Sequence, residues 1–265
     1  MAGIVRRGLQ LSRGAAASGL TGRPRTVRPE ILDELPPADA RAIRSRRDLQ
    51  RVNRVMGSCG ILSRAIRRAL ESLPPEAAPR ILELGGGDGT LALRIAKSLV
   101  TTRPVAELTL LDRQALISAA TGTAFAHLGW SLRPLTVDAL EWARAPTQQQ
   151  RSGRWDVILA NLFLHHFDDD GLRELLAAVA GRCAAFIACE PRRGPFALAG
   201  SRLLPALGVS ADTRHDAVVS VRAGFLGDEL SRLWPTASRT PWQLTERRAG
   251  LFSHLFIATH GEPVR

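Results

Sequence analysis

The chain has 265 residues, which suits one α/β domain with additions or two small domains. Hydrophobic residues make up 45% of it, so a packed core is feasible and a largely disordered chain is excluded. The formal net charge is +11, but six of the 36 basic residues lie within residues 1–29, which contain no acid, and this leaves 30 basic against 25 acidic residues. The charge of the remaining chain argues against a protein that binds nucleic acid through charge alone.

Residues 1–37 are expected to form a basic, disordered leader. The first 29 are rich in Arg, Ser, Gly and Ala, a composition that resembles an organellar transit peptide, and they lack the continuous apolar core of a secretory signal. We expect a cytoplasmic protein, with the organellar matrix as the alternative if residues 1–29 are a transit peptide. Polar residues interrupt every apolar run before about 18 residues, so no membrane span is expected.

The three cysteines have no C-x-x-C or other metal-binding spacing. They fit a reducing compartment, and no metal site is predicted from them.

One domain is predicted over residues 38–265, and it begins with cap helices over 38–73. Glycines at 57 and 60 are expected to interrupt the helical pattern there. Strand and helix patterns then alternate over residues 80–190. Five strands are expected, within residues 80–84, 106–112, 131–140, 155–167 and 184–191, with helices over 89–100, 113–128 and 168–183.

The end of the chain departs from this alternation. Residues 191–234 read as a helical insertion, and residues 235–265 as a terminal hairpin with its turn near Ala249 and Gly250. The predicted fold class is therefore α/β: a doubly wound, Rossmann-like, seven-stranded mixed sheet with a C-terminal antiparallel hairpin and helical additions.

The segment "ILELGGGDGTLAL", residues 81–93, places glycines directly after the first strand. A phosphate-binding loop needs a lysine after its last glycine, and none follows Gly89. A dinucleotide loop has a different glycine spacing, and Asp88 would put a negative charge where a pyrophosphate should lie. A ligand without phosphate but with a positively charged end fits better, because Glu83 ends the strand with a carboxylate.

"ELGGGDG" resembles the first motif of class I (Rossmann-like) S-adenosylmethionine-dependent methyltransferases, (E/D)-x-G-x-G-x-G. The resemblance covers residues 60–190 well and the hairpin loosely, and it implies S-adenosyl-L-methionine as cofactor. It also implies that residues 80–190 form the cofactor-binding core and that the insertion over 191–234 lies on the side of the methyl acceptor. In this family an acid after the second strand binds the ribose hydroxyls and one after the third binds the adenine amino group, roles that fall to Asp112 and Asp138. Ordinary loop acids or helix caps are the alternative for both. The implied cofactor-binding residues are Glu83, Gly85, Gly87, Gly89, Asp112, Asp138, Ala139 and Asn161.

A second motif indicates the class of methyl acceptor. "NLFLHHF", residues 161–167, resembles the fourth motif of small-molecule methyltransferases, including ubiquinone/menaquinone and antibiotic or polyketide tailoring enzymes. It lacks the (D/N/S)-P-P-(Y/F/W) motif of relatives that methylate amino groups of nucleic acids. The resemblance implies methyl transfer to a small, aromatic or polyketide-like acceptor by O- or C-methylation. His166, His165 and His215 are the catalytic candidates, as bases or acceptor-positioning groups. Packing or capping is the alternative for the adjacent pair, and a solvated loop for His215.

Two other functions stay open at this point. An RNA-modifying methyltransferase would show salt-sensitive RNA affinity, and a noncatalytic scaffold would bind the cofactor without turnover. The sequence leaves the identity of the acceptor, the methylated atom and the oligomeric state undecided.

Overall fold

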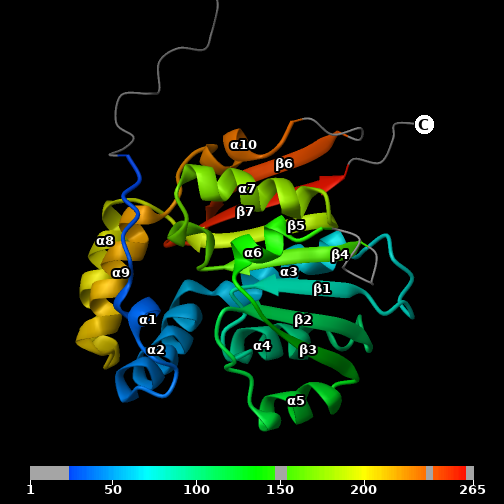
Figure 1. The fold of residues 1–265 in the computed structure, drawn as a ribbon, viewed down its shortest axis with the longest axis horizontal. Coiled ribbons are helices and arrows are strands. Elements are labelled where there is room, and N and C mark those ends of the chain that lie inside the picture. Colours follow the sequence, from blue (N-terminus) through cyan, green and yellow to red (C-terminus); the bar gives the residue numbers. More distant parts are fainter. Residues whose placement is uncertain (1–23, 147–153, 237–240, 261–265) are drawn as a thin grey trace, which may run out of the picture.

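The computed structural model describes residues 24–146, 154–236 and 241–260. Its centre is a seven-stranded sheet with strand order β3-β2-β1-β4-β5-β7-β6 (Figure 1). The strands are β1 (Arg80–Leu84), β2 (Ala106–Asp112), β3 (Trp130–Thr136), β4 (Trp155–Asn161), β5 (Cys183–Pro191), β6 (Trp242–Ala249) and β7 (Ser253–His260).

The first five strands pair in parallel, and β7 runs antiparallel to both β5 and β6. The predicted mixed sheet with a terminal hairpin is therefore confirmed. The sequence switches from strand–helix alternation to a tight hairpin at this edge, where Gly250 adopts a left-handed φ of 68° in the turn.

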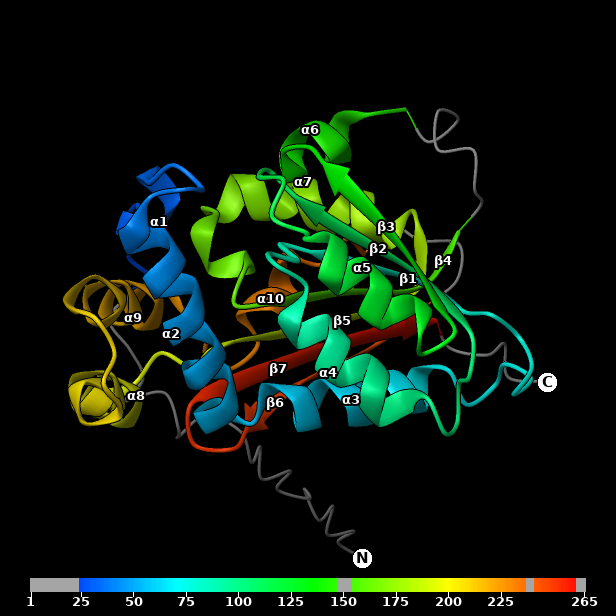
Figure 2. The same cartoon turned by 90° about the horizontal axis from the view of Figure 1, so that it is seen from below.

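Helices cover both faces of the sheet, so the central strands are buried on both sides (Figure 2). In β1, Ile81 packs with the core on one face, and Leu82 and Leu84 pack with the core on the other. One face is covered by α3 (Ser58–Ala69), α4 (Thr90–Leu99) and α5 (Ala119–Ala126), and the other by α6 (Ala139–Arg144), α7 (Asp169–Ala180) and α10 (Glu229–Leu233).

A separate helical group lies beside the sheet, at the end toward which the parallel strands point (Figure 1). In this group α9 contacts α1, α2 and α8, so the N-terminal helices pack against the predicted insertion. Its members are α1 (Ile31–Glu34), α2 (Ala40–Met56), α8 (Pro195–Leu203), the 3-10 turn η3 (Leu204–Leu207) and α9 (Ala211–Ala223).

Two boundaries differ from the predicted ones. Gly57 ends α2 in a left-handed conformation, as expected, whereas Gly60 lies inside α3. The helix predicted over residues 113–128 begins only at Ala119, because the side chain of Ser118 caps it by accepting a hydrogen bond from the Thr121 N–H.

Part of the segment predicted to be a disordered leader packs against the folded domain. Residues 1–23 lie outside the described residues, whereas residues 24–37 pack against the domain. Arg25 donates to the carbonyl oxygens of Phe167 and Ala223, and Glu30 is buried. These contacts join residues far apart in the sequence, and the basic composition of the segment does not indicate them. Within the described ranges, no helix is long and apolar enough to cross a membrane.

Candidate functional site

A cavity of about 530 Å³ opens at the carboxyl ends of the parallel strands, in the size range of small-molecule sites. Its sheet side includes Glu83, Gly85, Gly87 and Asn161, four of the eight predicted cofactor-binding residues. The facing walls come from the helical group and are largely apolar; among them are Leu49, Val52, Met56, Leu203, Leu204, Leu207 and Val221. The cavity therefore joins a polar sheet edge to an apolar compartment.

Glu83 places a buried carboxylate at this edge, near the end of β1. Its side chain is 3% exposed, and its Oε2 atom has no hydrogen-bond partner among the described residues. Burial, together with the negative charges of Asp112 and Asp88, raises the pKa of Glu83 to about 8. A positively charged ligand group beside Oε2 would stabilise the ionised carboxylate.

The glycine loop after β1 lies at the edge of the cavity, where Gly85, Gly86 and Gly87 line it. Gly87 has a left-handed φ of 56° and lines the cavity, and its N–H donates to Oδ2 of Asp112 at 3.0 Å. Gly89 does not line the cavity; it precedes α4 at the N-cap position. Asp88 accepts from the Thr90 N–H at 2.9 Å and from the Gln50 side chain at 3.0 Å, which ties the loop to α2.

Asp112 and Asp138 end up in different surroundings. Asp112 is half-buried beside the glycine loop, and it also accepts from the Gln114 N–H at 2.9 Å. Asp138 is exposed and caps α6: its Oδ1 accepts the N–H groups of Leu140 and Glu141. Neither acid lines the cavity itself, and the adjacent Ala139 is buried in the core. The capping alternative therefore describes Asp138 in this structure, and its ligand role stays a prediction.

Asn161 closes the sheet side of the cavity at the end of β4. Its Nδ2 donates to Oδ1 of Asn53 on α2 at 3.0 Å, while its own Oδ1 is buried without a partner among the described residues. The next residue, Leu162, has a φ of 50°, a conformation that L side chains rarely adopt. Such local strain concentrates at functional sites, and here it marks the turn that leads to the histidine pair.

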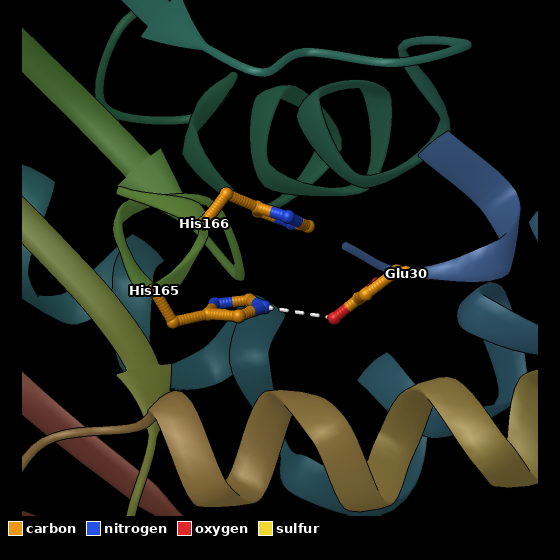
Figure 3. A group of neighbouring side chains, drawn as sticks. All are labelled: Glu30, His165 and His166. Carbon is orange, nitrogen blue, oxygen red and sulfur yellow. Dashed lines mark hydrogen bonds and ion pairs between the residues drawn. The ribbon is translucent and has the colours of Figure 1, made fainter. Parts of the chain in front are cut away.

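His165 follows this turn and is buried. It lies between two buried glutamates, Glu190 and Glu30, of which Figure 3 shows Glu30. Its Nδ1 lies 2.8 Å from Oε2 of Glu190, and its Nε2 lies 3.2 Å from Oε1 of Glu30. Glu190 is fixed in turn, because its Oε1 accepts the N–H groups of Phe163 and Leu164 at 3.0 Å each. Burial opposes protonation of His165, but the hydrogen bonds and charges of the two glutamates outweigh it and raise its pKa to about 9.

His166 follows in the same 3-10 turn, η2 (Leu164–His166), and lines the cavity. Its Nδ1 lies 3.0 Å from Oδ2 of Asp33, and its ring centroid lies 4.3 Å from that of His165. His215 lies elsewhere: it is exposed on α9, and it is the neighbouring Asp216 that lines the cavity. The structure thus brings together two of the three histidine candidates.

Sequence reasoning missed several residues of this site, above all Glu30, Asp33 and Asn53. Glu30 and Asp33 belong to the segment that was set aside as a leader, and their histidine partners lie more than 130 residues away. The one signal in the sequence is that Glu30 is the first acid of the chain. Glu190, near the end of β5, also belongs to the site: it is fully buried beside His165.

Comparison with known proteins bears on the fold. No protein-family model and no curated protein matches the sequence. Among solved structures, the plantazolicin methyltransferase BpumL in complex with SAH matches with a TM-score of 0.55 and 13% identity, over 82% of this chain and 90% of that one. The CurJ carbon methyltransferase matches with a TM-score of 0.52 and 18% identity, over 77% of this chain and 54% of that one. At these identities the likeness shows a shared Rossmann-like α/β fold.

Proposed function

We propose that this protein is an S-adenosylmethionine-dependent methyltransferase that methylates an oxygen or carbon atom of a small, aromatic or polyketide-like acceptor. The observation that carries the proposal is Glu83, a buried carboxylate with an unpartnered oxygen beside a glycine loop at the cavity. The fold shared with BpumL and CurJ adds support, because both of these proteins are methyltransferases.

The residues at the sheet edge fit the chemistry of this cofactor. Glu83 would bind the ammonium group, and the backbone at Gly85 and Gly87 allows close approach. Asp112 keeps acceptor capacity for a ribose diol, since each carboxylate oxygen accepts more than one hydrogen bond. Gly89, Asp138, Ala139 and Asn161 complete the proposed cofactor set. When bound, the cofactor supplies a methyl group on a positively charged sulfur.

The acceptor would lie against the helical group. Its apolar walls suit an apolar acceptor body and exclude water from the reacting groups. An acceptor that reacts through a hydroxyl group or an acidic carbon must lose a proton, and the cavity offers the imidazole–carboxylate cluster of His165, His166, Glu30, Glu190 and Asp33 for that purpose. His165 and His166 are the proposed catalytic residues of this cluster: His166 is the proposed base, and His165, which Glu30 and Glu190 hold in its protonated form, is proposed to position the acceptor.

Calorimetric titration of the full-length protein with S-adenosylmethionine and S-adenosylhomocysteine tests the donor half of the proposal. We expect one binding site, and we expect Glu83→Gln to weaken binding at least tenfold. Glu76→Gln, which changes an exposed acid in the turn before β1, should bind as the unmodified protein does. Absence of binding by the folded protein would overturn the proposal.

A screen of acceptors with methyl-labelled cofactor tests the second half. Transfer of label to an aromatic or polyketide-like compound is the expected result. Binding of the cofactor without transfer to any acceptor would favour a scaffold, and transfer to RNA would favour the RNA-modifying alternative.

A further inference from the structure

Three donor side chains converge between η2 and the segment that leads into α1. Glu30, His165 and His166 point into the same space, and one possible ligand atom of each lies within 4.8 Å of those of the other two (Figure 3). Nε2 of His165 lies 3.2 Å from Oε1 of Glu30. Two atoms bound to one metal ion at about 2.0–2.2 Å lie at a similar distance from each other, so this pair needs little adjustment to share an ion.

Both imidazoles are held as metal-binding histidines usually are. In protein metal sites the second ring nitrogen commonly hydrogen-bonds to a carboxylate, which fixes the orientation of the ring. Glu190 occupies that position on Nδ1 of His165, and Asp33 occupies it on Nδ1 of His166. The backbone N–H groups of Phe163 and Leu164 hold Glu190 in place. The ring of His165 is therefore oriented with Nε2 toward Glu30.

The charge around the three donors also favours a cation. Asp33 and Glu190 add two further carboxylates, and Asp216 lines the same cavity. Glu30 is held from α9 as well, because the Ser220 hydroxyl donates to its Oε1. Arg113 pairs with Asp33 at 3.2 Å, and a divalent ion placed here would balance the carboxylates of Glu30 and Glu190.

We propose that Glu30, His165 and His166 bind a divalent transition-metal ion of the zinc type. Two imidazole nitrogens and one carboxylate are a donor set suited to Zn²⁺ and similar ions, and a three-ligand site keeps a position open for another molecule. Glu30 and both histidines line the cavity, so the open position would face the acceptor compartment. With the ion bound, His165 and His166 act as its ligands and not as proton acceptors, and an acceptor with a metal-binding oxygen would be oriented by the ion. That role rests on the proposed methyl transfer, whereas the metal site does not.

The test is a titration of chelator-treated, full-length protein with Co²⁺, followed by its visible absorption spectrum, and then displacement of Co²⁺ by Zn²⁺. We expect one equivalent of Co²⁺ to produce d–d bands and Zn²⁺ to abolish them. Glu30→Gln and His166→Ala should each weaken Co²⁺ binding by about tenfold or more. The control His127→Ala, which removes an exposed histidine at the end of α5, should bind Co²⁺ as the unmodified protein does.

Circular dichroism and S-adenosylhomocysteine titration of each variant distinguish lost ligands from lost folding. His166 is half-buried in a surface turn, so His166→Ala serves as the decisive variant if Glu30→Gln does not fold. The metal site is overturned if the folded protein yields no d–d bands, or if folded His166→Ala binds Co²⁺ with unchanged affinity. Cofactor binding without Co²⁺ binding would remove the metal site alone, and the reverse result would remove the proposed methyl transfer alone.

Discussion

The backbone N–H of Gly87 donates to the Asp112 carboxylate at 3.0 Å, so the acid at the end of β2 holds the glycine loop that follows β1. A residue proposed to bind the ribose is thus also the support of the loop beneath it. Ribose binding and support of the loop would therefore both depend on the Asp112 carboxylate.

Replacement of Asp112 by alanine is expected to weaken cofactor binding at least tenfold. It removes a ligand acceptor and also leaves the Gly87 N–H without this partner, at a cost of about 1–3 kcal/mol. Calorimetry measures the loss, and Asp170→Ala, at an exposed acid of α7, serves as the control. Unchanged affinity in Asp112→Ala would refute the assignment.

Replacement of Glu83 by glutamine should have opposite effects on stability and binding. The folded-state pKa of Glu83 is about 8 against an ordinary 4.5, so the folded protein holds a proton that the unfolded chain releases between these values. Ionisation of Glu83 therefore lowers the free energy of unfolding. This loss is absent below about pH 4.5, grows as the pH rises, and levels off above about pH 8. At about 1.4 kcal/mol per tenfold change in proton affinity, it reaches at most ~5 kcal/mol.

Denaturant unfolding at several pH values measures this effect. The free energy of unfolding of Glu83→Gln relative to the unmodified protein should increase from pH 5 to pH 8, while the same variant binds the cofactor more weakly. A stability difference that does not vary with pH would contradict the raised pKa.

Replacement of His166 by alanine is expected to spare cofactor binding and to lower turnover tenfold or more. The side chain lines the cavity, and its hydrogen-bonding partner is Asp33, which is not among the proposed cofactor-binding residues. Transfer of labelled methyl to an acceptor found by screening gives the rate, and His127→Ala provides the matched control. A normal rate in His166→Ala would remove His166 from the catalytic residues.

Replacement of Gly85 by alanine should destabilise the protein by about 1–3 kcal/mol. Gly85 has a φ of 70°, and a methyl group there would overlap the ring of Phe163. Gly122→Ala, inside α5 with no atom near the added methyl group, should be neutral or stabilising by up to ~1 kcal/mol. Thermal unfolding compares the two variants, and adding Phe163→Ala to Gly85→Ala should remove the overlap but retain the cost of the left-handed backbone.

The strands and the sheet edge were predictable because their signals are local. The apolar runs of β1, β2, β4 and β5 are buried on both faces, and such runs are distinctive in sequence. Glu83, Asp112 and Asn161 each end a predicted strand, and parallel strands bring their carboxyl ends to one edge. The positions of these residues at the sheet edge therefore followed from the strand pattern and the order of the motifs.

The acceptor side was less predictable because its contacts are not local. The bond between His165 and Glu30 joins residues 135 positions apart, and no periodicity encodes that distance. The first 29 residues have the composition of a leader, and the segment that carries Glu30 was therefore predicted to lie outside the folded domain. His215 was a catalytic candidate, but neighbouring residues on a helix point about 100° apart, and α9 exposes His215 while it turns the adjacent Asp216 inward.

The walls of the cavity come from separate stretches of chain: the sheet edge from the alternating core, and the facing wall largely from α2, α8, η3 and α9. This division lets the two surfaces diverge independently during evolution. Substitutions in the flanking helices can reshape one compartment while the strand ends, which are fixed by the packing of the whole sheet, stay as they are. A family descended from such an ancestor would keep a common strand edge and vary in the helices that face it.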